Sequence, residues 1–311
     1  MTKPRIAVLC GGPFAGYSLM KLGMEKFLCG IVIGSGNDKI ANMFRSECER
    51  SELPFEHITG KDDVHLLAAW FEKVKPDAVF SICFPFRIPS QILLELPERF
   101  FNFHTGPLPA FRGPSPIFEV IRQQVSHTAL TVHCMTDAYD EGDIVFEERI
   151  AIAPDETYIS LANKMSNRCG YAAINMAEML QFASRVPARK QTDTDAKFYG
   201  FPKNSDLTIH WNTMSAETIS AVIRASGEWT KGAIAFWGDE QLRINQQVVE
   251  INHTNHAFTA GTIIKADPQT GYTVACLDGK QINITRFMSD YGELGFDYYR
   301  SIGLENGVCL T

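Results

Sequence analysis

Three polar residues, Asn102, His104 and Asp140, are the part of this 311-residue sequence whose types and spacing best fit chemistry. Asn102 and His104 stand two apart in an apolar run at 100–104 that is predicted to be a strand, so both side chains point to the same side of a sheet. A Gly-Pro pair follows, and ligands of open α/β sheets bind outside the carboxyl ends of the strands. The next predicted strand ends a few residues before Asp140, which we expect on a loop over the same crevice.

An amide, an imidazole and a carboxylate together suit acyl transfer to an amine. The amide of Asn102 can donate to the oxyanion that forms, an effect worth roughly 3–4 kcal/mol where single donors of this kind have been removed. His104, with an ordinary pKa of about 6.5, can accept or relay a proton near neutral pH. Asp140 can fix the tautomer of the imidazole, stabilise its charged form or hold a proton-carrying water. The residues alone leave a purely structural hydrogen-bonded cluster as the alternative.

A wider pattern surrounds these residues and resembles the folate-dependent formyltransferases. It consists of NFH at 102–104, LP at 108–109, RG at 112–113, Thr131 and DEGDI at 140–144. The pattern is close to that of methionyl-tRNA formyltransferase and its relatives that formylate amino sugars or amino acids. The resemblance extends through the second half of the chain, where IHW at 209–211 is similar to the start of the family's C-terminal domain.

This resemblance implies an enzyme that moves a formyl group from 10-formyltetrahydrofolate to an amine. Asn102 and His104 would stabilise the formyl centre, and Asp140 would act with His104 in proton transfer. Whether His104 or a water held by Asp140 is the immediate base stays open. The folate would lie against the main chain of two loops, and the residues implied to bind it are Phe86, Arg87, Ile88, Ala138, Tyr139, Asp140 and Asp143.

The acceptor side of the pocket departs from the family pattern. The loop after His104 begins Thr-Gly-Pro-Leu, whereas the family's loop usually begins with small polar residues and two leucines. The acceptor amine is therefore not fixed by the resemblance. The residues implied for this substrate loop are Thr105, Gly106, Pro107, Leu108 and Arg112.

Charge separates the possible acceptors. Residues 204–311 carry seven basic and twelve acidic side chains, a net charge of −5, which disfavours tRNA. We expect a small or carrier-bound amine: a nucleotide-linked amino sugar, a hydroxyornithine-like siderophore precursor or an aminoacyl carrier. Initiator-tRNA formylation, a non-catalytic folate-binding protein and a hydrolase of the formyl donor are the alternatives. The oligomeric state is open.

Short apolar runs alternate with helix-length segments in the first half, which indicates a Rossmann-like, mostly parallel α/β sheet covered on both faces. The predicted strands are 5–9, 29–33, 78–83, 100–104, 128–135 and 144–152, and the predicted helices 16–27, 38–52, 62–74 and 155–186. A polar segment with glycine and proline follows at 187–203 and is predicted to be a linker.

The second half has one helix signal, after a capping Ser215, and regularly spaced short strands. This pattern predicts a small OB-like β-barrel. Its strands are expected at 233–237, 241–244, 248–251, 261–264, 272–277 and 281–284. The predicted domains are thus a catalytic domain at 1–186 and a barrel domain at 204–311.

Composition sets the remaining expectations. A net charge of −7, eight scattered cysteines without a CxxC pair and no window of 18 apolar residues indicate a cytoplasmic protein without disulfides or membrane contact. His133 and Cys134 lack a second pair at ligand spacing, so no metal site is predicted. They face opposite sides of one strand, and one of them is expected in the core.

Overall fold

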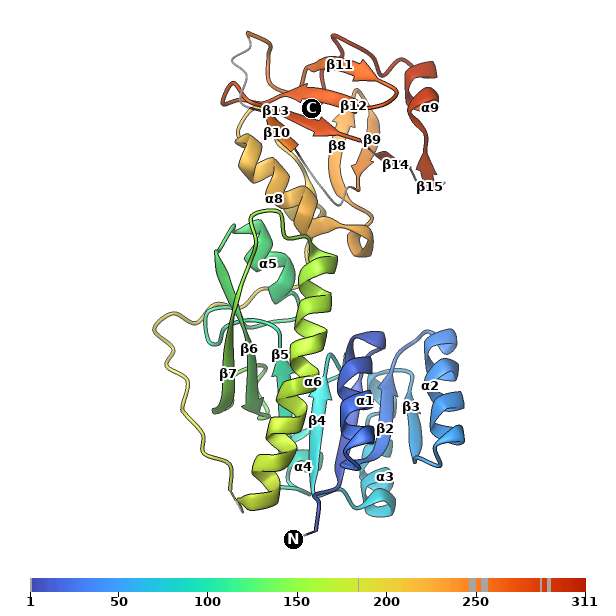
Figure 1. Ribbon diagram of the computed structural model, residues 1–311, viewed down its shortest axis with the longest axis vertical. Helices are drawn as coiled ribbons and strands as arrows, with labels where there is room; N and C mark the ends of the chain where they lie inside the picture. The colour runs from blue at the N-terminus through green and yellow to red at the C-terminus, as the bar shows by residue number, and fades with distance from the viewer. Residues whose placement is uncertain (1, 184, 246–249, 253–256, 286, 290–291) are drawn as a thin grey trace. The chain divides into compact units, whose positions relative to one another are not determined.

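The structure is a computed structural model that describes residues 2–183, 185–245, 250–252, 257–285, 287–289 and 292–311. The chain divides into two compact units (Figure 1). The first comprises 1–113, 128–150 and 162–199, and the second comprises 114–127, 151–161 and 200–311.

A seven-stranded sheet with the strand order β3-β2-β1-β4-β5-β6-β7 forms the centre of the first unit. The pairs among β1 to β5 are parallel, whereas β6 runs antiparallel to β5. The chain winds outward through β1, β2 and β3 and then returns to the other side of β1, so the order reverses between β1 and β4. The strands are β1 Ile6–Cys10, β2 Leu28–Gly34, β3 Phe55–Ile58, β4 Ala78–Ile82, β5 Phe100–His104, β6 His127–Cys134 and β7 Ile144–Ala151.

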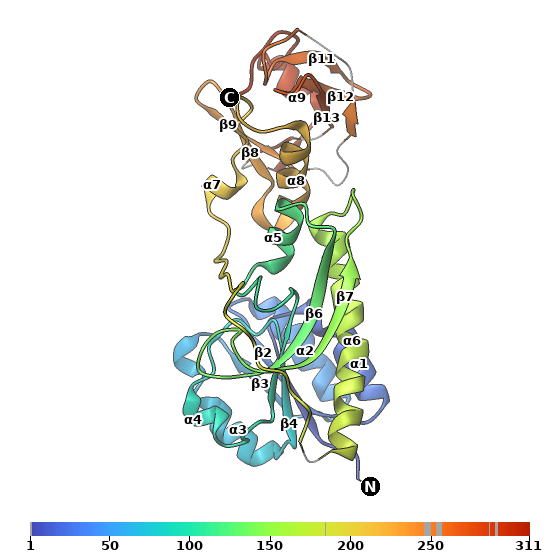
Figure 2. The ribbon, with the colours of Figure 1, turned by 90° about the vertical axis from the view of Figure 1, so that its left-hand side faces the viewer.

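Helices cover both faces of this sheet, which is why its central strands are almost wholly apolar. Figure 2 shows α1, α2 and α6 on one face and α3 and α4 on the other. Local signals set their ends: the Asn37 side chain accepts from the Lys39 N–H to cap α2, and α3 ends at the left-handed Lys75 before Pro76. The helices are α1 Gly16–Met24, α2 Asp38–Arg50, α3 Leu66–Val74, α4 Ser90–Leu93 and α6 Tyr158–Phe182.

The second unit contains two four-stranded antiparallel sheets and an apolar core that includes the buried side chains of Trp211, Tyr272 and Phe287. As predicted, Ser215 caps α8 by accepting the Thr218 N–H at 3.2 Å. The sheets have the orders β10-β13-β12-β11 and β15-β14-β9-β8. The elements are α5 Pro116–Arg122, α7 Asn204–Leu207, α8 Ala216–Ser226, β8 Ala233–Trp237, β9 Glu240–Ile244, β10 Glu250–Asn252, β11 Ile263–Asp267, β12 Gly271–Ala275, β13 Gln281–Ile284, β14 Phe287–Ser289, β15 Gly292–Leu294 and α9 Phe296–Ser301.

The fold class predicted from the sequence, a mostly parallel α/β sheet followed by a small antiparallel β domain, is confirmed. Strand β3 was missed because its four residues, FEHI, are mostly half-buried at the sheet edge and give no apolar run. The strand expected at 248–251 lies partly outside the described residues. The domain boundaries at 186 and 204 stay a prediction.

Candidate active site

Antiparallel pairing of β5 with β6 places four polar side chains on one face of the sheet. Asn102 lies opposite His133, and His104 lies opposite Thr131. Because side chains alternate along a strand, these two pairs share a face.

The path of the chain to Asp140 differs from the prediction. Since β6 is antiparallel, its carboxyl end lies beside Phe101, away from the end of β5 that His104 occupies. The Met135 N–H donates to the Phe100 carbonyl at 2.8 Å, which marks that end. The expectation that both strands end at one crevice was therefore wrong. Asp140 nevertheless meets His104, because the loop after β6 returns along the sheet.

The turn at Asp140 needs unusual backbone geometry. Asp140 has φ 56°, in the left-handed region that non-glycine residues seldom adopt. Gly142 follows, and a Cβ at this position would lie 1.7 Å from the Cys134 carbonyl oxygen. A glycine at 142 therefore lets the loop press against the end of β6.

Two of the predicted catalytic residues, Asn102 and His104, both contact the third, Asp140. His104 Nδ1 is 3.6 Å from Asp140 Oδ1, and Asn102 Nδ2 is 3.4 Å from the same oxygen. The Gly113 N–H donates to the other carboxylate oxygen at 2.8 Å. His104 is 5% exposed, whereas Asn102 and Asp140 are partly exposed.

Hydrogen bonding selects one neutral tautomer of His104. Its Nε2 is 2.6 Å from the Phe111 carbonyl oxygen, which can only accept, so the proton is on Nε2. In the neutral ring Nδ1 is then bare and faces Asp140. Burial lowers the pKa of His104 below its ordinary 6.5, and His133 adds to this, while the charge of Asp140 and the Phe111 carbonyl oppose it.

Asp140 is a carboxylate at every physiological pH. Burial raises its pKa, but His104, His133 and the Gly113 N–H together outweigh burial and hold the pKa at about 2. The site thus combines a permanent anion with an imidazole that prefers to be neutral.

His133 belongs to this cluster, and the sequence interpretation had set it aside. Its Nδ1 donates to the Cys134 carbonyl at 2.9 Å, so in the neutral ring Nε2 is free to accept from the Asn102 amide at 3.2 Å. Nε2 also lies 3.3 Å from Asp140 Oδ1. The missed signal was the antiparallel pairing, which puts residue 133 on the face that carries 102 and 104.

The two loops expected to hold the folate lie side by side. Arg87 Nη2 donates to the Asp137 carbonyl at 2.8 Å and pairs with the carboxylate of the same residue. Tyr139 is 59% exposed, whereas the Ile88 side chain is buried in the core. Phe86 packs edge-on against Phe84, and Ala138 is exposed. The Asp143 carbonyl accepts from Cys134 N–H, which ties down the end of the second loop.

Most of the predicted substrate loop is occupied by contacts within the chain. Thr105 and Leu108 are buried, and the Gly106 carbonyl accepts from the Thr131 hydroxyl at 2.8 Å. Pro107 accepts from the Phe111 N–H. The guanidinium of Arg112 is buried too and is bonded to side chains of this chain rather than open to a substrate.

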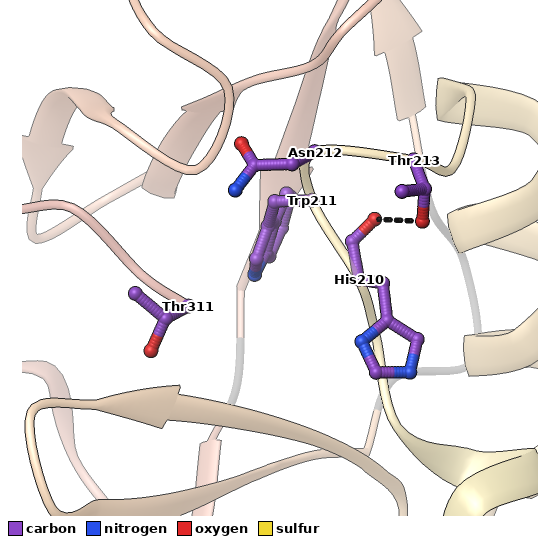
Figure 3. A pocket seen from close by; sticks show the side chains of 5 residues that line it. All are labelled: His210, Trp211, Asn212, Thr213 and Thr311. Carbon is purple, nitrogen blue, oxygen red and sulfur yellow. Dashed lines mark hydrogen bonds between the residues drawn. The ribbon is translucent and has the colours of Figure 1, made fainter.

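A separate hollow lies wholly within the second unit (Figure 3). Its lining is His210, Trp211, Asn212, Thr213 and Thr311, and the Thr213 hydroxyl donates to the His210 carbonyl at 3.4 Å. It shares no residue with the cluster around Asp140 and offers a single titratable side chain. It is therefore a poor candidate for chemistry.

In the part of the chain that the structure describes, no helix has the length and apolar character needed to cross a membrane. The same described residues contain no group of three or more His, Cys, Asp or Glu side chains that could hold a metal ion.

An imidazole and an amide on one face of an α/β sheet, a carboxylate from a neighbouring loop and a small β domain that follows agree with the formyl transferase class. The family's sequence profiles match at 63–175 (formyl transferase) and 203–290 (formyl transferase, C-terminal domain). The chain belongs to the formyl transferase family.

Solved structures share this fold. The sugar 3N-formyl transferase WlaRD, determined with dTDP and 5-N-formyl-THF, has a TM-score of 0.68 at 13% identity, covering 94% of this chain and 99% of that one. The N-formyltransferase of Helicobacter canadensis, complexed with folinic acid and dTDP-3-aminofucose, has a TM-score of 0.66 at 14% sequence identity. The match covers 94% of this chain and 100% of that one. HypX from Aquifex aeolicus has a TM-score of 0.66 at 16% sequence identity. The match covers 97% of this chain but only 49% of HypX, so this chain spans about half the length of that protein.

Proposed function

We propose that this protein transfers the formyl group of 10-formyltetrahydrofolate to an amine, with Asn102, His104 and Asp140 as the catalytic residues. The observation that carries this proposal is the buried His104, which has a bare Nδ1 in its neutral form and a permanent carboxylate 3.6 Å away.

The proton of the attacking amine goes to His104 Nδ1. As that nitrogen becomes an N–H, it gains Asp140 Oδ1 as a partner, so the imidazolium is stabilised only when it forms. Addition of the amine nitrogen to the formyl carbon would give a tetrahedral oxyanion. The bond from that carbon to the donor nitrogen would then break as the donor nitrogen takes up a proton. His104 is suited to return that proton.

Asn102 is the proposed donor to the oxyanion. Both of its N–H groups have partners, His133 Nε2 at 3.2 Å and Asp140 Oδ1 at 3.4 Å. The 3.4 Å contact is long and therefore weak. We infer that this N–H is the one that turns to the developing negative charge.

The residues present fit the formyl donor, whose role is to supply an activated one-carbon group. The loops at 84–89 and 136–140 are joined through Arg87 and Asp137, and Tyr139 presents an open aromatic ring beside them. Main-chain groups of both loops and this ring are the proposed contacts of the pterin.

A small, nucleotide-linked amino sugar is the acceptor class that we place first. Two structures that match this chain over nearly their full length support this choice: one is described as a sugar 3N-formyl transferase in the presence of dTDP, and the other is complexed with dTDP-3-aminofucose. A hydroxyornithine-like precursor, an aminoacyl carrier and initiator tRNA are the other acceptors to test. We propose that the protein works in the cytoplasm, where it would meet these substrates.

The test is a mass-spectrometric assay with 10-formyltetrahydrofolate and a panel of these four acceptor kinds. A formylated product that disappears in His104→Ala supports the proposal. Formate released without any acceptor would instead indicate a hydrolase, and tight folate binding with no product from any acceptor would indicate a non-catalytic folate-binding protein.

A further inference from the structure

Gln191, in the segment predicted to be a linker, reaches the loop that carries Asp140. Its Nε2 donates to two main-chain carbonyls, those of Asp140 and Gly142, each at 2.8 Å. Its Oε1 accepts from Arg112 Nε at 3.3 Å and Nη2 at 2.9 Å. Reversing the amide would turn its oxygen toward two carbonyls and its N–H groups toward a guanidinium, so its orientation is fixed by its neighbours.

The side chain of Arg112, which binds the Gln191 amide, is itself fixed by several other contacts. Its side chain also contacts Asp193 Oδ1 at 3.2 Å and Glu141 Oε1 at 3.4 Å. Its main chain bonds the same linker segment, accepting from the Tyr199 N–H and donating to the Lys197 carbonyl. A buried cation with several partners is a rigid anchor for Gln191.

The segment is attached on the other side of the Asp140 loop as well. Arg189 and Ile144 exchange two main-chain hydrogen bonds of 2.8 Å. Residues 189–199 are therefore bonded to the start of β7 and to the substrate loop, and Gln191 lies between these attachments.

The left-handed backbone at Asp140 needs such support. This conformation is unfavourable for a residue other than glycine, even though Asp tolerates it better than most. Relaxation of Asp140 would move its carboxylate away from His104 and from the Gly113 N–H. The carbonyl that Gln191 binds belongs to the strained residue itself.

We propose that Gln191 is a positioning residue that holds Asp140 in its left-handed conformation and so keeps the carboxylate beside His104. The consequence for catalysis rests on the proposed function; the consequence for the geometry of Asp140 does not. The segment at 187–203 thus completes the site rather than only connecting two parts of the chain.

Three variants separate this role from general packing. Gln191→Glu keeps the side-chain volume and the contact with Arg112 but removes both N–H donors. Gln191→Ala removes all four hydrogen bonds without adding charge. Thr192→Ala, at the neighbouring exposed position, is the matched control.

The first readout is amide hydrogen exchange at Gly113, whose N–H donates to Asp140 Oδ2. We expect exchange at least about tenfold faster in Gln191→Glu and Gln191→Ala, which corresponds to the loss of one ordinary hydrogen bond. In Thr192→Ala the rate should match that of the wild type.

The second readout is the NMR titration of the His104 ring in Gln191→Ala. The groups facing this ring are Asp140, His133 and the Phe111 carbonyl. With the carboxylate displaced, the pKa of His104 should fall further below that of the wild type, because the charge that raises it is lost. In the formylation assay, kcat should fall while KM for the acceptor stays unchanged.

Unchanged Gly113 exchange and an unchanged His104 titration in folded Gln191 variants would overturn the proposal. If neither variant folds, Gln191 serves stability rather than positioning, and the proposal also fails. If the wild type transfers no formyl group, the proposed function fails, yet the exchange and titration still decide the role of Gln191.

Discussion

His104 is subject to opposing influences, since burial favours the neutral ring and the nearby carboxylate favours the charged one. The net effect lowers its pKa below 6.5. A base is active when unprotonated, so activity is complete above this pKa and is lost as the pH falls through it. We therefore expect the acidic limb of kcat, which does not depend on protonation of the free amine, to lie below pH 6.5 in the wild type, measured from pH 5 to 9.

Asp140→Asn tests the contribution of the carboxylate to the pKa of His104. Removing the charge that raises the pKa of His104 should move the acidic limb to still lower pH, while kcat falls by about 10²–10⁴. His127 is an exposed histidine at the start of β6, and His127→Ala should leave both quantities unchanged. An acidic limb at or above 6.5 in the wild type would contradict the assignment of His104 as the base.

His133 is expected to orient the Asn102 amide. Because its Nε2 accepts one Asn102 N–H at 3.2 Å, His133→Leu should free the amide to rotate and lower kcat by about tenfold, with little change in KM. His133→Gln, which restores an acceptor, should recover part of the loss. Equal activity of the Leu variant and the wild type would show that the orientation of Asn102 does not depend on His133.

At the scale of elements, the loop between β6 and β7 depends on its glycine. A Cβ at residue 142 would lie 1.7 Å from the Cys134 carbonyl oxygen. That oxygen belongs to the backbone, so it cannot move aside as the end of a flexible side chain could. Gly142→Ala should lower the free energy of unfolding by about 1–3 kcal/mol, as overpacking usually does, and should displace Asp140. Urea denaturation measures the first effect and the formylation assay the second.

Gly36→Ala is the control for this substitution. Nothing lies within 4 Å of a Cβ at Gly36, and its φ is not in the left-handed region. Its free energy of unfolding should equal or slightly exceed that of the wild type. If both alanine variants behaved alike, the close approach at Gly142 would not be important for stability.

The sequence predicted these elements well where local signals were strong. The strand at 100–104 and the helix capped by Ser215 were found because an apolar run and a cap residue are local features. The direction of β6 is set by pairing between distant residues, so His133 was set aside and the path to Asp140 was wrong. Gln191 was missed for the same reason, since nothing near it in the sequence indicates Asp140.

For the molecule as a whole, charge bears on the choice of acceptor. The chain has a net charge of −7, and residues 204–311 contribute −5 of it. When a protein binds tRNA, its basic side chains neutralise phosphates and release their counterions. The affinity for tRNA therefore falls steeply as the salt concentration rises. Residues 204–311, which fall largely in the family's C-terminal domain, carry only seven basic side chains that could neutralise phosphates, against twelve acidic ones.

We therefore expect no complex with initiator Met-tRNA in a gel-shift experiment at low salt, and no formyl-Met-tRNA in the mass-spectrometric assay. A small acceptor should be formylated under the same conditions, at a rate that changes little with salt because few counterions are released. An authentic methionyl-tRNA formyltransferase serves as the positive control for the tRNA. A retarded band that weakens steeply with salt, together with formylated Met-tRNA, would mean that basic side chains gather locally despite the acidic total, and the acceptor would then be tRNA.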